Sequence, residues 1–243
     1  MSPLRQSLGL VIGLALWASS AEADPNRGVF DIYLGNLKVG VFAFSGVEAQ
    51  GRYSTAGLLR STGVVGFFAN VRYDAKSQGR VRGARYVPSS YEERAEIGAQ
   101  SSELSIIYDN GVPRAPVFNP PRPGENDVDL GRQGDALDLM TALYTLLRGV
   151  PEPEVCGYDA FVFDGVRRTR LSLAPREADG RRVICDAEYR RVEGFTAEEL
   201  SERPTFGFDL VFAPIADGLW AVDEANVDTV YGPIRLERRP PDG

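Results

Sequence analysis

The sequence predicts a mainly antiparallel β protein of the α+β class, with a curved sheet or open half-barrel, one long central helix and one short helix. Two observations favour this class. Apolar and polar residues alternate over much of the chain, and pairs of turn-forming residues separate the alternating runs at hairpin spacing. The pairs are Gly35-Asn36, Asn110-Gly111, Asp164-Gly165, Asp179-Gly180 and Asp217-Gly218.

Residues 1–23 have the layout of a secretory signal peptide. Arg5 supplies the positive charge, and Leu8 to Ala18 form an apolar stretch that is too short to span a membrane. Ala21-Glu22-Ala23 places small side chains before a cleavage site. We therefore expect cleavage after Ala23 and an exported, periplasmic protein with no integral membrane span after the signal has been removed.

We expect residues 24–243 to form a single β-rich domain, with about ten to twelve strands over 28–118 and 157–238. Phe30, Ile32 and Leu34 illustrate the period of two at the start of this region. The alternative is two small β domains that meet near the middle of the chain. A single amphipathic helix, however, needs a sheet to cover its apolar stripe, which favours one domain.

Gly63 to Ala69 (GVVGFFA) is wholly apolar although it lies between two predicted strands. An ordinary surface loop would be polar. The segment therefore forms either a short buried helix that closes one end of the sheet or a lid over an apolar cavity. In the second case Phe67 and Phe68 would border a ligand site.

A loop rich in proline and glycine covers 119–134, and the main helix is predicted over 135–148. Asp135 is the expected N-cap, and Gly149 and Pro151 would end the helix. Its apolar stripe consists of Ala136, Leu139, Met140, Leu143, Leu146 and Leu147. The short helix is predicted over Ala197 to Glu202, where Thr196 and Glu199 have the spacing of a capping box.

Cys156 and Cys185 are the only cysteines. An oxidising compartment favours a disulfide between them, and Cys185 is expected to face inward because it belongs to an alternating run. The rival interpretation is a pair of buried free thiols.

Composition excludes much catalytic chemistry. The chain has no histidine and a net charge of −7, which argues against nucleic acid or anionic lipid as an electrostatically driven partner. Without histidine there is no Ser-His-Asp triad and no imidazole metal ligand. Neither lysine lies in a phosphate-binding loop, and no dinucleotide-binding or serine-hydrolase motif occurs. We expect a protein that is not an enzyme, with no cofactor and no metal.

Acidic and basic residues are interpreted as surface charge. Asp127 and Asp129 lack the closing glutamate of a calcium loop, so we interpret them as solvated. The arginines, Arg82 and Arg85 among them, are interpreted in the same way. A glycoside hydrolase with paired carboxylates has no support beyond the presence of acidic residues.

The run from Tyr33 to Arg85 resembles the bacterial exported family catalogued as domain of unknown function 3108. The later stretches DALDLMTALYTLLR, CGYDAFVFDGVRRTRLSL and CDAEYRRVEGF resemble the same family, so that the resemblance covers roughly 28–238. It implies a secreted, β-rich envelope protein without an assigned catalytic residue. It also implies an architecture similar to the open half-barrels of lipoprotein carriers, in which helices plug a curved sheet that holds acyl chains; this second likeness is fold-level analogy.

Two functional hypotheses follow. The first is a periplasmic binding or carrier protein for an apolar small molecule, such as a lipid or acyl chain, with Phe67, Phe68, Leu139, Leu143 and Leu147 as the candidate ligand-binding residues. The alternative is a non-catalytic envelope protein that contacts another exported protein or a cell-wall polymer through loop 119–134.

Overall fold

The computed structural model describes residues 24–63, 70–122, 128–178 and 180–240. The predicted signal peptide, Phe67, Phe68 and Asp127 lie outside these residues. The first half of the chain forms strands β1 (Arg27–Leu34), β2 (Leu37–Ala49), β3 (Arg52–Ser61), β4 (Val71–Arg82), β5 (Arg85–Ile97), β6 (Gln100–Asp109), β7 (Val112–Pro113) and β8 (Val117–Asn119). The middle contains the 3-10 helix η1 (Leu130–Arg132), β9 (Ala136–Leu137), helix α2 (Leu139–Leu147), β10 (Val150–Pro151) and η2 (Glu152–Glu154). The last part contains β11 (Asp159–Phe163), β12 (Arg168–Ala178), β13 (Val183–Glu193), α3 (Ala197–Glu202), β14 (Thr205–Pro214), η3 (Ala216–Gly218), β15 (Leu219–Thr229) and β16 (Gly232–Arg238).

The described strands belong to one large, curved and unclosed sheet of sixteen strands. The main order is β7-β6-β5-β4-β3-β2-β1-β16-β15-β14-β13-β12-β11-β9, and every pair in it is antiparallel except β9 with β11. The prediction of a mostly antiparallel β fold is confirmed. The predicted number of strands was too low because β7, β8, β9 and β10 are two or three residues long and have no alternating pattern.

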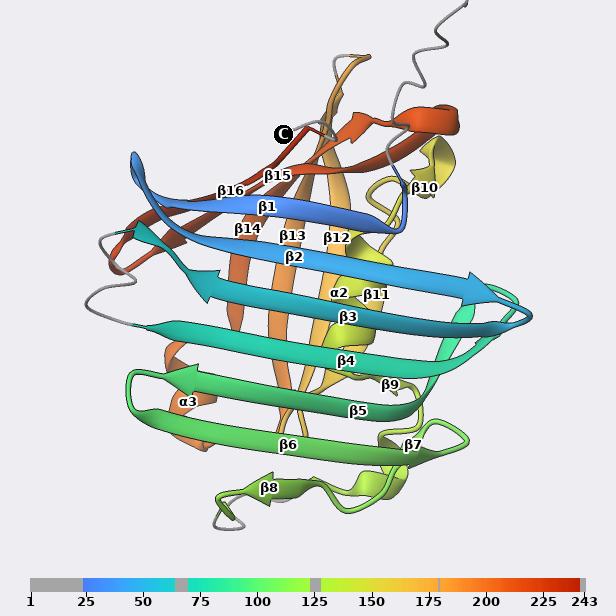
Figure 1. The fold of residues 1–243 in the computed structure, drawn as a ribbon, viewed down its shortest axis with the longest axis vertical. Coiled ribbons are helices and arrows are strands. Elements are labelled where there is room, and N and C mark those ends of the chain that lie inside the picture. Colours follow the sequence, from blue (N-terminus) through green and yellow to red (C-terminus); the bar gives the residue numbers. More distant parts are fainter. Residues whose placement is uncertain (1–23, 64–69, 123–127, 179, 241–243) are drawn as a thin grey trace, which may run out of the picture.

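The sheet bends into two layers with α2 between them (Figure 1). Strands β1 to β6 form one layer, β11 to β14 form the other, and β15 and β16 connect the two. Helix α2 contacts β3 and β4 on one side and β11 and β15 on the other. No helix in the described part of the chain is long and apolar enough to cross a membrane.

The main helix is shorter than predicted, and its N-cap was assigned to the wrong residue. It covers Leu139–Leu147, not 135–148, and is therefore not a long helix. Asp138 caps it, because its carboxylate accepts a hydrogen bond from the Thr141 amide at 2.8 Å. Asp135 instead pairs with Arg168, and the two residues that follow it form β9 against β11. The ion pair with Arg168 and the pairing of β9 with β11 thus take the place of the first helical turn that sequence periodicity predicts.

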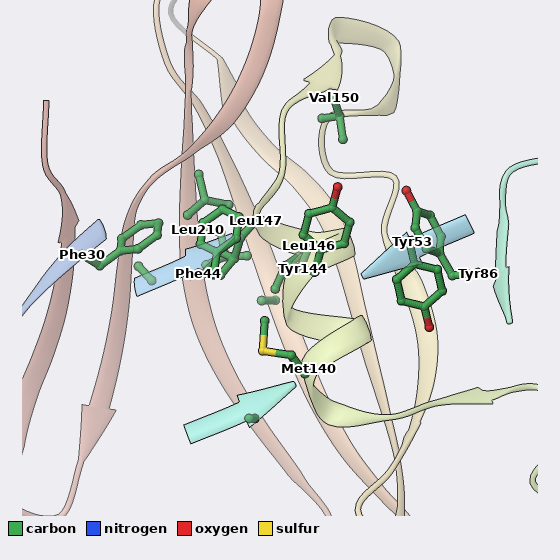
Figure 2. Close-up of a cluster of buried hydrophobic side chains, with 14 of the residues drawn as sticks. Phe30, Phe44, Tyr53, Tyr86, Met140, Tyr144, Leu146, Leu147, Val150 and Leu210 are labelled. Atoms are coloured by element: carbon green, nitrogen blue, oxygen red, sulfur yellow. The ribbon is translucent and has the colours of Figure 1, made fainter. Parts of the chain in front are cut away.

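Two glycines let α2 approach the sheet closely. A Cβ atom on Gly46 would lie 2.2 Å from the Tyr144 ring, and one on Gly57 would lie 2.6 Å from the Met140 sulfur. The Phe30, Phe44 and Leu210 side chains lie on one side of the helix, whereas those of Tyr53 and Tyr86 lie on the other (Figure 2). These residues belong to the buried core, so α2 completes the hydrophobic interior between the layers.

Arg238 holds the C-terminal end of α2. Its guanidinium donates hydrogen bonds to the carbonyls of Leu147 at 2.9 Å, Val222 at 2.7 Å and Arg27 at 3.1 Å, and it lies over the Phe30 ring. Burial lowers the pKa of Arg238 to about 10, so the group stays charged at neutral pH. A cation at this end also suits the negative pole of the helix dipole.

The short helix and the disulfide agree with the predictions. Helix α3 covers Ala197–Glu202, and its capping box joins Thr196 and Glu199. Cys156 and Cys185 form a disulfide, and Cys185 is fully buried on β13. The disulfide connects the segment before β11 to the middle of the second layer.

Candidate functional site

The three predicted ligand-binding residues that the structure describes all lie on α2. Leu147 is buried, whereas Leu139 and Leu143 are partly buried and pack against the hydrophobic core. The helix brings them together on one stripe, but none of them lines either of the two hollows described below. Phe67 and Phe68 lie outside the described residues.

The larger hollow, of about 1320 Å³, crosses the outer surface of the first layer. Charged side chains on β4, β5 and β6 dominate it, and they already pair with one another. Lys76 contacts Glu92 at 2.9 Å, and Arg94 contacts Glu103 at 3.5 Å. Because most of its charged side chains form ion pairs within the protein and its floor is an exposed sheet face, this groove offers a ligand few unpaired charges.

The second hollow, of about 1080 Å³, lies at the open seam of the sheet and is the better candidate site. We call it the seam pocket. It lies between the β4–β5 hairpin of the first layer and β11 of the second, with α2 and the segment 150–158 between them. Its volume is at the upper end of the range for small-molecule sites.

Local sequence explains how the walls of the seam pocket form. Gly83 has a positive φ of 63° in the turn that places Arg82 directly opposite Arg85. On the other wall, the disulfide fixes Cys156 beside β13. Strand β9 pairs with β11 only at Phe161 and Val162, and the pocket borders the start of β11, from Asp159 to Phe161.

The base of the pocket is apolar. Its lining includes the buried side chains of Leu146, Val150 and Phe212, together with the partly buried Phe161 and Leu173. Burial of an apolar chain against such side chains contributes roughly 25 cal/mol per Å² of apolar surface removed from water. The base therefore suits the hydrocarbon part of a ligand.

Two carboxylates near the rim are already neutralised. Both oxygens of Asp135 accept hydrogen bonds from Arg168, at 2.8 and 2.9 Å, and this contact lowers the pKa of Asp135 below its usual value. The Asp159 carboxylate accepts a hydrogen bond from Arg170 Nε at 2.7 Å, and this contact likewise lowers its pKa.

Arg148 lies where α2 ends, and its position is fixed by the fold. Its guanidinium carbon is 5.7 Å from the centre of the Tyr86 ring, and its Nη1 donates to the Gly149 carbonyl at 3.2 Å. The Arg148 Nε atom is buried and has no hydrogen-bond partner in the described part of the chain. The Tyr86 hydroxyl donates a hydrogen bond to Glu48. Burial raises the pKa of Tyr86, and the hydrogen bond to Glu48 raises it further, so the ring beside Arg148 is a neutral phenol.

A second polar cluster lies at the other end of α2, within the core. The fully buried Asp138 accepts hydrogen bonds from the hydroxyls of Ser77 at 2.8 Å and Thr141 at 2.7 Å. Thr141 also contacts the Tyr53 hydroxyl at 2.8 Å. The Ser77 and Tyr53 contacts join the helix to the first layer, so we interpret this cluster as structural and do not include it in the site.

The seam pocket is lined by apolar side chains, arginines and carboxylates. Cys156 lines it, but the disulfide removes its thiol. Within the described residues no group of three or more Asp, Glu, His or Cys side chains could hold a metal ion. Sequence reasoning did not place Arg82, Arg85 and Arg148 in one pocket, because the first two were interpreted as ordinary surface charge and nothing in the sequence connects them to the end of the helix.

Comparison with known proteins gives one match. A family model described as Protein of unknown function (DUF3108) matches residues 29–178, more than half of the chain. This confirms the predicted resemblance, although the match ends before β13 and not near residue 238. No curated protein and no solved structure matches significantly.

Proposed function

We propose that this chain, which belongs to the family of proteins of unknown function DUF3108, is an exported, non-catalytic binding or carrier protein for a small molecule with an apolar chain. The ligand would lie in the half-barrel, between the two layers and beside α2. One observation carries the proposal: the open seam leaves a pocket of about 1080 Å³ whose base is formed by buried apolar residues.

Export to the periplasm is part of the proposal. Its support is the signal-peptide pattern of residues 1–23, together with a disulfide of the kind that persists in oxidising compartments. The disulfide also bears on binding, because Cys156 forms part of the pocket wall.

The alternative, an envelope protein that uses loop 119–134 to contact a partner, has weaker support. The end of this loop is attached to the body of the protein through Gln133. Gln133 is fully buried and donates to the Asp129 carbonyl at 3.0 Å, and its side-chain oxygen accepts from Arg168 at 3.1 Å. Gln133 thus anchors the end of the loop, whereas residues 119–122, 129, 131 and 132 are exposed.

The proposal is tested by native mass spectrometry of the protein purified from its own periplasm, followed by organic extraction. We expect an apolar molecule at near-stoichiometric amount. In Ala160→Trp a large side chain is added to a partly exposed lining position of β11, which should displace the molecule. The matched control is Ala99→Trp, which adds the same side chain to an exposed turn at the far end of β5 and should retain it.

Two results would refute the proposal. One is a wild-type protein that carries no molecule and takes none up from a lipid extract. The other is a folded Ala160→Trp protein, as judged by near-ultraviolet circular dichroism, that retains its molecule at the same stoichiometry as wild type.

A further inference from the structure

The charged side chains of the seam pocket do not balance. Four arginines line it, Arg82, Arg85, Arg148 and Arg170, against the three carboxylates of Asp135, Glu154 and Asp159. Arg170 and Asp159 neutralise each other, and Arg168 neutralises Asp135. Three arginines and one glutamate remain, an excess of two positive charges (3 − 1) in a protein whose net charge is −7.

None of these three arginines makes an ion pair with a carboxylate within the described residues. Arg148 is held by the Tyr86 ring and the Gly149 carbonyl. Arg85 donates through Nη2 to the Gly134 carbonyl at 2.8 Å. It also lies near enough to Asp135 to help lower the pKa of that carboxyl, but both Asp135 oxygens are bound by Arg168.

Arg82 and Arg85 occupy the rim of the pocket from a single hairpin. They are directly opposite each other in the β4–β5 register, so their side chains leave the sheet on the same face. Arg148 enters from the end of α2, on the inner side of the pocket. Guanidinium groups that line one pocket from two elements suit an anion, because each presents a planar fork of donors that matches a carboxylate or phosphate group.

We propose that the ligand of the seam pocket carries a carboxylate or phosphate group, which Arg82, Arg85 and Arg148 bind while its apolar chain lies along the base of the pocket. This inference rests on the proposed binding function and names the ligand class: a single-chain amphiphile with an anionic end. The apolar base and the excess positive charge belong to the same pocket, so one molecule can satisfy both.

The test uses two fluorescent probes, dansylated undecanoic acid and its methyl ester, which share a chain and differ in charge. We expect wild-type protein to bind the acid at least about tenfold more tightly than the ester, a difference of about 1.4 kcal/mol. The variant R82Q/R85Q/R148Q should lose this preference and bind the two probes equally. The matched control is R52Q/R80Q, which removes another pair of facing arginines, on β3 and β4 and outside the pocket, and should bind as wild type does.

A measurement on wild-type protein alone guards against a variant that folds poorly. Raising the salt concentration from about 0.05 M to about 0.5 M should weaken binding of the acid and leave binding of the ester unchanged, because salt screens only the charged contact. Inorganic phosphate and acetate serve as competitors without a chain. Displacement of the acid by phosphate alone identifies a phosphate-bearing ligand, and displacement by acetate alone identifies a carboxylate; either result supports an anion site.

Failure of this inference is distinguishable from failure of the proposed function. If wild type binds acid and ester equally, and neither salt nor the triple variant changes this, the anion site is refuted while apolar binding stands. If neither probe binds and no lipid extract supplies a ligand, the binding function itself is refuted.

Discussion

Replacement of Asp138 by asparagine should change how the stability of this protein depends on pH. Asp138 is fully buried, and among the described residues it has no cation as partner and accepts side-chain and amide hydrogen bonds only from Ser77 and Thr141. Burial raises the pKa of this carboxyl from 3.8 to about 6, although the hydrogen bonds partly oppose that rise. Burial also raises the pKa of the neighbouring phenols of Tyr53 and Tyr108, which therefore stay neutral over this range.

The sign follows from proton uptake. Between about pH 4 and about pH 6 the folded state retains a proton on Asp138 that the unfolded state has released, so stability falls as the pH rises. A shift of about two pKa units at 1.36 kcal/mol per unit corresponds to about 3 kcal/mol. The carboxyls of Asp31, Asp135 and Asp159 have lowered pKa values, so their contributions are lost only as the pH falls below about 4.

Urea denaturation of wild type and Asp138→Asn from about pH 4 to about pH 7 measures the effect. Asparagine also caps helices well, so the variant should fold. We expect the difference in free energy of unfolding between the two proteins to change by about 3 kcal/mol across this range, in favour of the variant at the higher pH. Asp109→Asn, at an exposed site, is the matched control. If the curves for wild type and Asp138→Asn run parallel, Asp138 does not titrate as the structure implies.

Three further changes test the packing around α2. Gly46→Ala would place a methyl group 2.2 Å from the Tyr144 ring and should lower the free energy of unfolding, measured in urea, by about 1–3 kcal/mol. The control is Gly207→Ala, whose Cβ meets no atom closer than 4.0 Å and which should leave the urea midpoint almost unchanged. Replacing both cysteines by alanine removes the disulfide across a sequence separation of 29 residues and should lower the free energy of unfolding by about 4 kcal/mol, measured by thermal or urea unfolding. An unchanged midpoint would contradict the stabilising role given to the disulfide. In Arg238→Lys the side chain cannot reproduce the three hydrogen bonds to carbonyls, so the free energy of unfolding should fall by about 2 kcal/mol or more. The control Arg190→Lys, at an exposed ion pair, should lower it by about 0.5 kcal/mol or less. Equal losses in the two variants would refute the role given to Arg238.

The parts of the fold that could be predicted from sequence are those set by local chemistry. The alternating run around Cys185 identified an inward-facing strand, and the capping box of α3 placed that helix at its observed bounds. The start of α2 could not be placed this way, because Asp135 and Asp138 are both acceptable caps. Pairing of Asp135 with Arg168 decided between them, across more than thirty residues of chain.

The candidate site could be predicted from the sequence even less well than the start of α2. Sequence periodicity indicated the stripe that contains Leu139, Leu143 and Leu147, and a binding role was assigned to it because it was apolar. The structure places that stripe against the core, and the pocket lies where two elements distant in sequence meet. Arg82 and Arg148 approach the same pocket only because the sheet bends around α2, and no local pattern encodes that bend.

The attachment of α2 bears on how a ligand would reach the proposed site. Asp138 joins its first turn to β4 through Ser77, Arg238 binds the carbonyl of its last residue, and the Gly149 amide donates to the Pro25 carbonyl at 2.7 Å. Moving the helix would break buried charged contacts at both ends, each of which costs about 1–3 kcal/mol or more when one partner is left unsatisfied. Movement of α2 out of the half-barrel is therefore disfavoured. A ligand bound as proposed would instead enter and leave through the seam, past Arg82 and Arg85. On this proposed route Arg82 and Arg85, which form no ion pair within the described residues, would meet the anionic end of a ligand at the rim of the pocket.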